Sequence, residues 1–544
     1  MSEFPSLILI GVDGGSFDLI EPWIAAGELP GIASLLRGGC IGRLRSTHPP
    51  LTPVAWSSML TGCSPGRHGI YAFLEIPPER YEPRFLSGGS LPLKTVFEAA
   101  SDAGLRVGAL NVPWTWPPLA VNGFCLSGID APDFGPGIAH PPELFDELTR
   151  RFGGYFDKNV PPRTEGYALD RLEDRIEKLG AMSRFLLAAR PVDLFAVVFV
   201  STDQVQHWFW RERSVRARDG RCIEDLLLHV WCRVDREIGR IVEECAGRET
   251  TVLLVSDHGA GPCTGGVNLN RWLEQEGWLR RSSPSPAGRL RRTALRLGGR
   301  LLPDALRRRL RRRLGGARRR TLARLLASGI DWRATEAFCW GDYGNISVNA
   351  EERFARGRVA PGRRDALVDE IAEALMEIRS PETGERVMSA PLRGRELYRG
   401  DRTERAPDLL AVPRGYRWEI LTDFTLSGPL PEGLRGSVIG PSRRQGTHRL
   451  QGIFCATGSG IREGGRLSGA RIEDVAPTIL HLLGQAIPED MEGRALSEIL
   501  RREKRQAHRP VREALSMERE GTSAAYSAAE RARVERDLQG LGYL

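Results

Sequence analysis

Four runs of apolar and β-branched residues are spaced along the chain, and each one ends in glycine or polar residues. They read SLILIGVDGG (6–15), RVGALNVP (106–113), VDLFAVVFVSTD (192–203) and TTVLLVSDHG (250–259). Two of the stretches between them, 172–190 and 222–245, have apolar residues at helical spacing. Runs that are apolar on both faces and alternate with helices are typical of parallel strands covered by helices. The pattern therefore predicts an α/β fold with a parallel-rich central sheet sandwiched by helices.

Polar residues that can bind metal ions collect where these predicted strands end. Ligands of parallel sheets gather at the carboxyl ends of the strands. In STDQVQHW the aspartate and the histidine are four residues apart, so both face the same way on a helical turn. Three carboxylates and three imidazoles provide two three-ligand sets for borderline metals such as zinc. The candidates are Asp13, Asp203, His207, Asp257, His258 and His448.

Each of these residues also has a structural interpretation when taken alone. A single aspartate after a strand caps a helix or starts a turn more often than it binds a metal. A lone histidine such as His448 is more often a polar surface residue. The functional interpretation depends on the whole set, because each member lies beside a predicted strand end or a glycine.

The composition is that of a soluble globular protein, with 41% hydrophobic and 27% charged residues among 544. No apolar run approaches the roughly 18 residues that span a bilayer. The start, MSEFPSLILIGVDGG, lacks a basic segment and a small-residue cleavage site, so its apolar run suits a buried strand better than a signal peptide. The nine cysteines are scattered without CxxC spacing. This favours reduced thiols, argues against a cysteine zinc site and predicts a cytoplasmic protein.

The formal net charge of +8 comes from one segment of the chain. Residues 280–324 contain 17 Arg, no Lys and one acid, a net charge of +16, so the other residues together carry −8. Leucines recur among the arginines at helical spacing, which predicts a basic helical insertion over residues 280–328. We interpret it first as a solvated insertion or lid that guides anionic substrates. A second interpretation is peripheral contact with an anionic membrane. Nucleic acid is the least favoured partner, since the segment has no aromatic residue for base stacking.

The order of the motifs along the chain resembles that of a known family. GVDGG is followed by P-x-T and TG-x-x-P-x-x-HG, then by D-x-x-x-H, SDHG and GTH. As a set, these motifs resemble the alkaline phosphatase superfamily, and within it the type I phosphodiesterase/nucleotide pyrophosphatase branch. IEDVAPTILHLLGQAIPEDMEGRAL (472–496) and LGYL (541–544) also resemble segments of bacterial relatives of that branch. The resemblance covers most of the chain, except for the basic segment.

The resemblance implies an alkaline phosphatase-like catalytic domain over residues 1–500 with a smaller cap region. The cap segments would be residues about 130–190 and about 330–440, with the basic helical insertion at 280–328. Residues 501–544 would form a C-terminal helical tail, in which the end of the chain, 526–544, reads as an amphipathic helix.

The resemblance also implies a site for two divalent metal ions, with zinc expected and manganese or iron as alternatives. The implied ligands are Asp13, Asp257 and His258 for one ion and Asp203, His207 and His448 for the other. Thr52 would bridge toward the first ion. Two metal ions roughly 4 Å apart serve phosphoryl transfer, because one activates the attacking hydroxyl and the other stabilises the leaving oxygen.

Two residues compete as the nucleophile, Thr52 and Cys63. The cysteine lies in CSPGR, which fits the C-x-P-x-R motif of sulfatases. In the family that the chain resembles, the nucleophile precedes the threonine of TG by nine residues, and here that spacing leads from Thr61 back to Thr52. Cys63 lies after Thr61, where the family has variable residues. Thr52 is also a good helix N-cap with Pro53 at the first helical position, so its hydroxyl would face an anion site. We therefore expect Thr52 to attack.

One position departs from the family pattern. Nucleotide pyrophosphatases usually carry an asparagine three residues after HGI that helps to hold the phosphate, and here that residue is Phe73. Asn111 in NVPW would contact the substrate from the neighbouring strand end, although a structural role in a turn is the stronger interpretation. A threonine nucleophile favours a diesterase or pyrophosphatase over a monoesterase.

The leading hypothesis is an enzyme, a two-metal hydrolase of phosphodiester or phosphoanhydride bonds that forms a phosphothreonine intermediate on Thr52. Its substrate would be a phosphorylated small molecule or lipid. The first alternative is a phosphomonoesterase or phosphomutase on the same fold. The second is a non-catalytic scaffold that binds a membrane or nucleic acid through residues 280–324, and the complete set of metal-binding residues argues against it.

Overall fold

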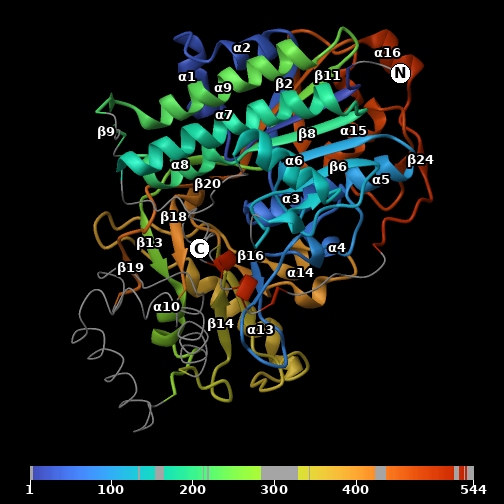
Figure 1. The fold of residues 1–544 in the computed structure, drawn as a ribbon. Helices are drawn as coiled ribbons and strands as arrows, with labels where there is room; N and C mark the ends of the chain where they lie inside the picture. The colour runs from blue at the N-terminus through green and yellow to red at the C-terminus, as the bar shows by residue number, and fades with distance from the viewer. Residues whose placement is uncertain are drawn as a thin grey trace.

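A nine-stranded sheet forms the centre of the molecule in the computed structural model of the chain (Figure 1). The structure describes residues 4–132, 135–153, 165–211, 213–216, 220–282, 329–341, 343–422, 437–519, 526–527, 529–531 and 533–535. The strands of the main sheet are β1 (Leu7–Val12), β2 (Gly39–Arg45), β5 (Val107–Val112), β6 (Gly123–Ser127), β7 (Ala139–His140), β8 (Leu194–Phe199), β11 (Thr251–Val255), β21 (Gln451–Gly458) and β22 (Gly465–Arg471). Their order across the sheet is β22-β2-β21-β11-β1-β8-β5-β6-β7.

The central strands β11, β1, β8, β5 and β6 run parallel to one another. Four of them are the apolar runs found in the sequence, which confirms the predicted parallel-rich sheet. Alternate residues of β1 enter two different core clusters, Leu7 and Leu9 on one face and Ile8 and Ile10 on the other. β21 is antiparallel to β11, so the sheet is mixed beyond its parallel centre.

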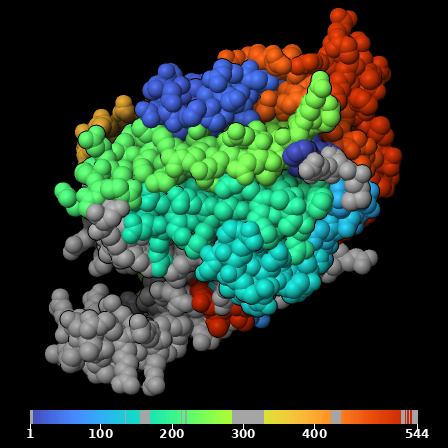
Figure 2. All heavy atoms as spheres, turned by 45° about the horizontal axis from the view of Figure 1, so that its top comes forward, coloured from blue at the N-terminus to red at the C-terminus, as the bar shows by residue number. Residues whose placement is uncertain are grey.

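Helices cover both faces of the sheet. The face that buries Ile8 and Ile10 packs against α1 (Phe17–Ala25), α2 (Pro30–Arg37), α6 (Glu143–Phe152), α7 (Glu165–Ala189), α8 (Ser201–Phe209) and α9 (Leu226–Cys245). The opposite face packs against α3 (Thr52–Thr61), α5 (Val96–Asp102) and α15 (Val475–Leu482). α7 and α9 lie side by side (Figure 1) and confirm the two helices expected from apolar spacing. Figure 2 shows them as adjoining teal and green bands next to the blue α1 and α2.

A smaller unit, here named the cap, is built from residues between 263 and 445 and contains two small sheets. One is β14-β15-β17-β16, with β14 (Ala337–Trp340), β15 (Asn345–Val348), β16 (Leu392–Arg393) and β17 (Leu409–Leu410). The other is β18-β13-β19, with β13 (Gly265–Asn268), β18 (Trp418–Leu421) and β19 (Ile439–Gly440). The cap also contains α10 (Leu269–Gln275), α13 (Pro361–Leu375) and α14 (Gly394–Leu397). The cap segment predicted at about 330–440 falls within this unit.

The other segment predicted to belong to a cap, about 130–190, is part of the main fold in its described residues. β7 pairs with β6 at the edge of the main sheet. Leu172, Ile176 and Leu179 of α7 are buried in the core cluster beneath the helical layer. The apolar face of α7 therefore covers the sheet, and the sequence-based assignment of this segment to a cap is wrong.

A two-stranded ribbon joins the cap to the main sheet. β12 (Gly259–Pro262) pairs antiparallel with β20 (Gly446–Arg449), and the cap residues lie between these strands in the sequence. The short elements of the structure are α4 (Pro65–His68), β3 (Leu74–Glu75), β4 (Arg84–Phe85), β9 (Val215–Arg216), β10 (Cys222–Ile223), β23 (Ile487–Pro488), α16 (Arg502–Ala507) and β24 (Arg512–Glu513).

Two predicted segments lie wholly or partly outside the described residues. Of the basic insertion at 280–328, only residues 280–282 are described, and the predicted C-terminal tail is described continuously only from 501 to 519. Within 501–519 the chain forms the short helix α16 and the two-residue strand β24. In the described part of the chain, no helix has the length and apolar character required to cross a bilayer.

Candidate functional site

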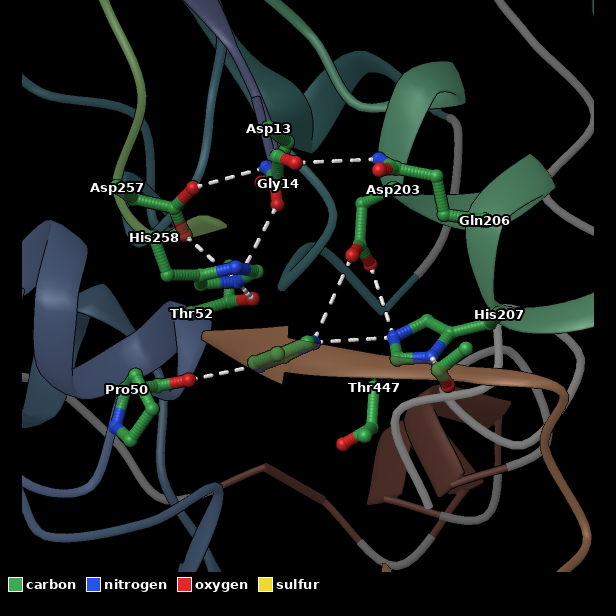
Figure 3. A network of polar contacts seen from close by, with 12 residues as sticks. Asp13, Gly14, Pro50, Thr52, Asp203, Gln206, His207, Asp257, His258 and Thr447 are labelled. Atoms are coloured by element: carbon green, nitrogen blue, oxygen red, sulfur yellow. Dashed lines mark hydrogen bonds and ion pairs between the residues drawn. The ribbon is translucent and has the colours of Figure 1, made fainter. Parts of the chain in front are cut away.

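The candidate metal-binding residues converge at the carboxyl end of the parallel strands (Figure 3). Asp13 follows β1, and Asp257 and His258 follow the neighbouring strand β11. Asp203 and His207 lie on α8, directly after β8, and His448 lies in β20. All six side chains are buried, with no more than 1% of any residue exposed. The structure therefore brings together every metal-binding candidate that the sequence indicated.

The first group contains Asp13, Asp257 and His258. One donor atom from each residue lies within 4.8 Å of the others. His258 Nε2 is 3.2 Å from Asp257 Oδ2 and 3.6 Å from Asp13 Oδ1. This is the set that the sequence predicts for one metal ion.

The second group surrounds Asp203. Its Oδ2 is 3.1 Å from His207 Nε2, and its Oδ1 is 3.5 Å from His448 Nε2. The expectation that Asp203 and His207 share one face of a helical turn is confirmed by α8. His258 also lies within 4.8 Å of the donor atoms of Asp203 and His448. Since the rings of His258 and His448 stack with centroids 3.6 Å apart, the two predicted ligand sets adjoin through these histidines.

Backbone carbonyls fix the orientation of all three imidazoles. The Nδ1 atoms of His207, His258 and His448 lie 3.1, 3.1 and 2.7 Å from the carbonyl oxygens of Gly446, Gly259 and Pro50. A carbonyl oxygen only accepts hydrogen bonds, so each Nδ1 carries a hydrogen, and in the neutral form of each ring Nε2 presents a lone pair to the cluster. This is the arrangement by which proteins orient metal-binding histidines.

The carboxylates leave several buried oxygens without a donor. Among the described residues, no hydrogen bond reaches Asp13 Oδ1, Asp257 Oδ2 or either Oδ atom of Asp203. A buried, unsatisfied carboxylate oxygen is costly, because it loses water and gains no partner. Four such oxygens beside three Nε2 lone pairs suit divalent cations such as zinc, which bind imidazole nitrogen and carboxylate oxygen. The residues present therefore fit the metal ions that the sequence implies.

The charges of the cluster act on one another. Burial, together with the negative charges of Asp257 and Asp203, raises the pKa of Asp13 well above its ordinary value. Burial likewise raises the pKa of Asp257 to about 6. Burial opposes ionisation of Asp203 as well, but His207 and His448 outweigh it and hold the pKa of Asp203 below its ordinary value. Asp203 therefore carries its negative charge in the histidine-rich part of the cluster.

Thr52 lies at the start of α3 and reaches the first group of ligands. Its Oγ1 is 3.3 Å from His258 Nε2, and the residue is fully buried. The helix begins at Thr52 itself with Leu51 as its N-cap, one residue earlier than the sequence indicates. The free amides of the first helical turn form an environment that favours anions.

Cys63, the alternative nucleophile, lies past the far end of α3. Its Sγ is 3.5 Å from the carbonyl oxygen of Thr61 and 3.4 Å from that of Asp490. Burial raises the pKa of the Cys63 thiol to about 12, so the reactive thiolate is disfavoured. Cys63 and Thr52 occupy opposite ends of one helix, and only Thr52 is hydrogen-bonded to a member of the cluster.

The two positions connected with substrate binding are both engaged in packing. Phe73 is buried, and its ring meets that of Trp114 edge-on, with centroids 5.9 Å apart. The Asn111 side-chain amide donates a 2.8 Å hydrogen bond to the carbonyl oxygen of Val198. Asn111 also has a left-handed backbone, with φ of 57°. These observations favour the structural interpretation of Asn111, and its contact with substrate stays a prediction.

Sequence reasoning missed the residues that support the ligands from behind. Trp56 Nε1 lies 3.4 Å from Asp13 Oδ2, one helical turn after Thr52. A side chain at Gly11 would bring its Cβ within 2.9 Å of the Trp56 ring, so this glycine, two residues before Asp13, makes room for the indole. Thr202 donates a 2.6 Å hydrogen bond to the Asp13 carbonyl. The sequence feature that could have indicated Trp56 is its position four residues after Thr52.

Aromatic residues of the cap contact the cluster and its surroundings. The Tyr343 ring stacks on His448 with centroids 5.2 Å apart. The Tyr416 hydroxyl lies 2.7 Å from Nδ1 of His48, and the Tyr398 hydroxyl donates to the His48 carbonyl. The Tyr343 contact places a cap side chain directly on the cluster, and the contacts of Tyr416 and Tyr398 hold the cap against His48 beside it.

The model of a known protein family covers most of the chain. Residues 7–437 match the sequence model of a family described as type I phosphodiesterase / nucleotide pyrophosphatase. No curated protein sequence matches the chain. Among solved structures, murine ectonucleotide pyrophosphatase / phosphodiesterase 5 is 13% identical, with a TM-score of 0.50 and coverage of 91% of this chain and 100% of that chain. The human protein of the same name is 14% identical, with a TM-score of 0.49 and coverage of 91% and 99%. At this identity the likeness concerns the fold.

Proposed function

Because the chain belongs to the type I phosphodiesterase / nucleotide pyrophosphatase family, we propose that it hydrolyses phosphodiester or phosphoanhydride bonds by a two-metal mechanism with Thr52 as the nucleophile. Membership of this family makes the protein a metal-dependent phosphohydrolase. The observation that carries the finer proposal is the set of four buried carboxylate oxygens without donors, facing three imidazole nitrogens beside the Thr52 hydroxyl. We assign Asp13, Asp257 and His258 to one ion and Asp203, His207 and His448 to the other.

The proposed reaction has two steps, and the phosphoryl group is carried by Thr52 between them. The Thr52 oxygen attacks phosphorus, the bond from phosphorus to the leaving oxygen breaks, the proton of the Thr52 hydroxyl passes to water, and the leaving oxygen takes up a proton from water. Water then attacks the phosphothreonine, which releases the phosphate product and restores the hydroxyl. The bound divalent ions would supply the positive charge that activates the nucleophile and stabilises the leaving oxygen. The N-terminus of α3 presents amides to the phosphoryl oxygens, and the cap excludes water from the site.

The expected substrate is a phosphorylated small molecule or lipid. Phe73, where the family pattern has a phosphate-binding asparagine, packs against Trp114 and supplies no polar contact to a phosphate. Metal charge and helix amides therefore have a larger share in holding the phosphoryl group than in a family member with that asparagine. We propose cytoplasmic action, with the basic segment at 280–324 as the part that would meet an anionic membrane surface.

A substrate panel with variants of the nucleophile tests the proposal. Elemental analysis of the purified protein should find bound zinc, manganese or iron, and bis-nitrophenyl phosphate should be cleaved faster than nitrophenyl phosphate. Thr52→Ala should lower kcat on the order of a thousandfold or more, about 4 kcal/mol of transition-state stabilisation. Thr52→Ser keeps a hydroxyl and should retain measurable turnover.

Trapping the intermediate separates the proposal from its alternatives. Rapid acid quenching during turnover should give a peptide that contains phosphorylated Thr52, and this peptide should be absent from Thr52→Ala. Full activity of Thr52→Ala would exclude the nucleophile assignment. A preference for nitrophenyl phosphate would favour the phosphomonoesterase alternative, and metal-free protein without turnover would favour the scaffold alternative.

A further inference from the structure

A cavity lies beside the ribbon that carries His448. It has a volume of about 710 Å³ and is lined by residues of α1, β12 and β20, together with residues 415–417 and the segment after α8. Successive residues of a strand point to opposite faces. In Figure 3 the Thr447 side chain lies on the side of β20 opposite to Asp203. Arg449, two residues further along, shares that side and lines the cavity, whereas none of the six metal-binding candidates lines it.

The lining of the cavity is strongly basic. It contains Arg43, Arg213, Arg417 and Arg449 but only one acid, Asp18. Asp18 pairs with Arg43, and Arg213 pairs with Asp225. For Arg417 and Arg449 the described part of the chain provides no carboxylate partner. Within the described residues, two of the four positive charges therefore have no neutralising carboxylate.

Hydrogen bonds hold one of these two arginines in place at the cavity. The Arg449 guanidinium donates to the carbonyl oxygens of Tyr416, His448 and Pro262 at 2.6, 2.9 and 2.6 Å. These bonds fix its position but do not neutralise its charge. Arg417 lines the same cavity, and burial together with the positive charge of Arg417 lowers the pKa of Arg449 to about 10. Two guanidinium groups that line one cavity attract an anion, because its charge relieves the repulsion between them.

The other walls of the cavity are aromatic. Trp23 of α1, Trp210 at the end of α8 and Tyr416 all line it. Flat apolar walls favour a planar group, and arginine also stacks on aromatic rings. A purely inorganic anion would use the basic wall alone.

We propose that this cavity is a second binding site, separate from the metal-binding cluster, for a small anion of the phosphate or phosphonate type that carries an aromatic ring. Arg417 and Arg449 bind the anionic group, and Trp23 and Trp210 contact the ring. Since β12 follows His258 and β20 contains His448, a ligand in the cavity contacts the same ribbon that positions two of the histidines.

Isothermal titration of the metal-loaded protein with phenylphosphonate tests this site, because a hydrolase does not cleave the carbon–phosphorus bond of this probe. Arg417→Glu reverses the charge of an exposed side chain that forms no ion pair within the described structure, and Arg358→Glu is the matched control. Arg358 is an exposed cap residue that also forms no ion pair there and lies outside the cavity lining. Wild type and Arg358→Glu should bind one molar equivalent more than Arg417→Glu. Melting temperature and metal content show whether each variant is intact.

Two further probes separate the contribution of the ligand's anionic group from that of its aromatic ring. Inorganic phosphate, which lacks the ring, should bind at the Arg417-dependent site at least tenfold more weakly than phenylphosphonate. Benzyl alcohol, which lacks the charge, should not bind there. Equal stoichiometry and affinity for phenylphosphonate in all three proteins would overturn the second site. Equal affinity of phosphate and phenylphosphonate would overturn the assignment of an aromatic ligand.

Discussion

The Nε2 atoms of His207 and His448 lie 3.0 Å apart, although the Nδ1 atom of each ring faces a backbone carbonyl. When both rings are neutral and carry their hydrogens on Nδ1, two lone pairs face each other inside a buried cluster. Such a contact is repulsive unless a cation or a proton lies between the nitrogens. Asp203 is in contact with both rings and adds negative charge at the same point.

Removal of the metal ions should therefore destabilise the fold as well as stop turnover. A chelator should lower the melting temperature, and zinc or manganese should restore it. An ion present at a thousandfold its dissociation constant contributes about 4 kcal/mol to the free energy of unfolding. Differential scanning fluorimetry with parallel activity assays measures both effects. An unchanged melting temperature and full turnover in protein shown to be metal-free would contradict the two-ion assignment.

Trp56→Phe should weaken metal binding with little effect on the chemistry at saturating metal. The substitution keeps the buried ring but removes the N–H that faces Asp13 Oδ2. Loss of a hydrogen bond to a metal ligand typically lowers metal affinity by about 10- to 100-fold. Titration of activity against metal concentration separates the apparent metal affinity from kcat.

The matched control is Trp340→Phe. Trp340 is also buried, and its Nε1 donates to Ser347 Oγ in the cap at 2.9 Å. The Trp340→Phe substitution should change the stability of the protein without changing its affinity for metal. The same shift in metal affinity for both variants would show that Trp56 has no specific role in positioning Asp13.

Cys63→Ser should retain hydrolase activity. The serine hydroxyl can donate to the carbonyl oxygen of Thr61 or Asp490, as the thiol does. Mass spectrometry of the wild type should show an unmodified cysteine at position 63, and native protein should resist alkylation there at pH 8, because the thiol has a pKa of about 12. A formylglycine at position 63, or loss of turnover in a folded Cys63→Ser protein, would revive the sulfatase interpretation.

His68 should make the stability of the protein depend on pH below about 6.5. Its Nδ1 accepts a hydrogen bond from the Ile70 amide, and its Nε2 lies 2.9 Å from Ser58 Oγ. Burial lowers the pKa of His68 from 6.5 to about 3. Because the unfolded chain binds the proton first, the contribution of neutral His68 is complete above pH 6.5 and is lost as the pH falls toward 3. The loss is about 1.4 kcal/mol per pH unit.

Comparison with His68→Asn isolates this contribution. The asparagine oxygen can accept from the Ile70 amide, and the side chain does not titrate. Between pH 6.5 and pH 5, urea unfolding of the wild type should lose about 2 kcal/mol more than that of the variant. Parallel stability profiles for the two proteins would show that His68 is protonated in the folded state.

The sequence predicts the parallel centre of the fold from local apolar patterns, and the order of its motifs indicated the residues that the structure brings together in the cluster. The apolar runs gave four strands of the parallel sheet, and the four-residue spacing placed Asp203 and His207 on one helical face. The antiparallel strands β2 and β21 pair Cys40 with Ala456, a contact that no local pattern indicates. The assignment of α7 to a cap was wrong for a related reason, because packing against the sheet decides whether a helix belongs to the core or to a cap.

The contacts around the cluster depend on tertiary packing in the same way. Tyr343 approaches His448 only after the cap has folded back onto the main sheet, and their positions are 105 residues apart. Trp56 is recognisable as a partner of Asp13 only when β1 and α3 are placed in space. Such residues follow from three-dimensional neighbours rather than from spacing along the chain.

The chain leaves the main fold at β12 and returns at β20, where Pro262 is paired directly with Gly446. The cap and the basic segment both lie between these two residues, so they form one continuous insertion whose ends are held side by side. The entropic cost of closing such an insertion grows only slowly with its length. Insertions and deletions within it can therefore accumulate without moving His258 or His448. The architecture allows evolution to change what the enzyme recognises independently of the chemistry that it performs.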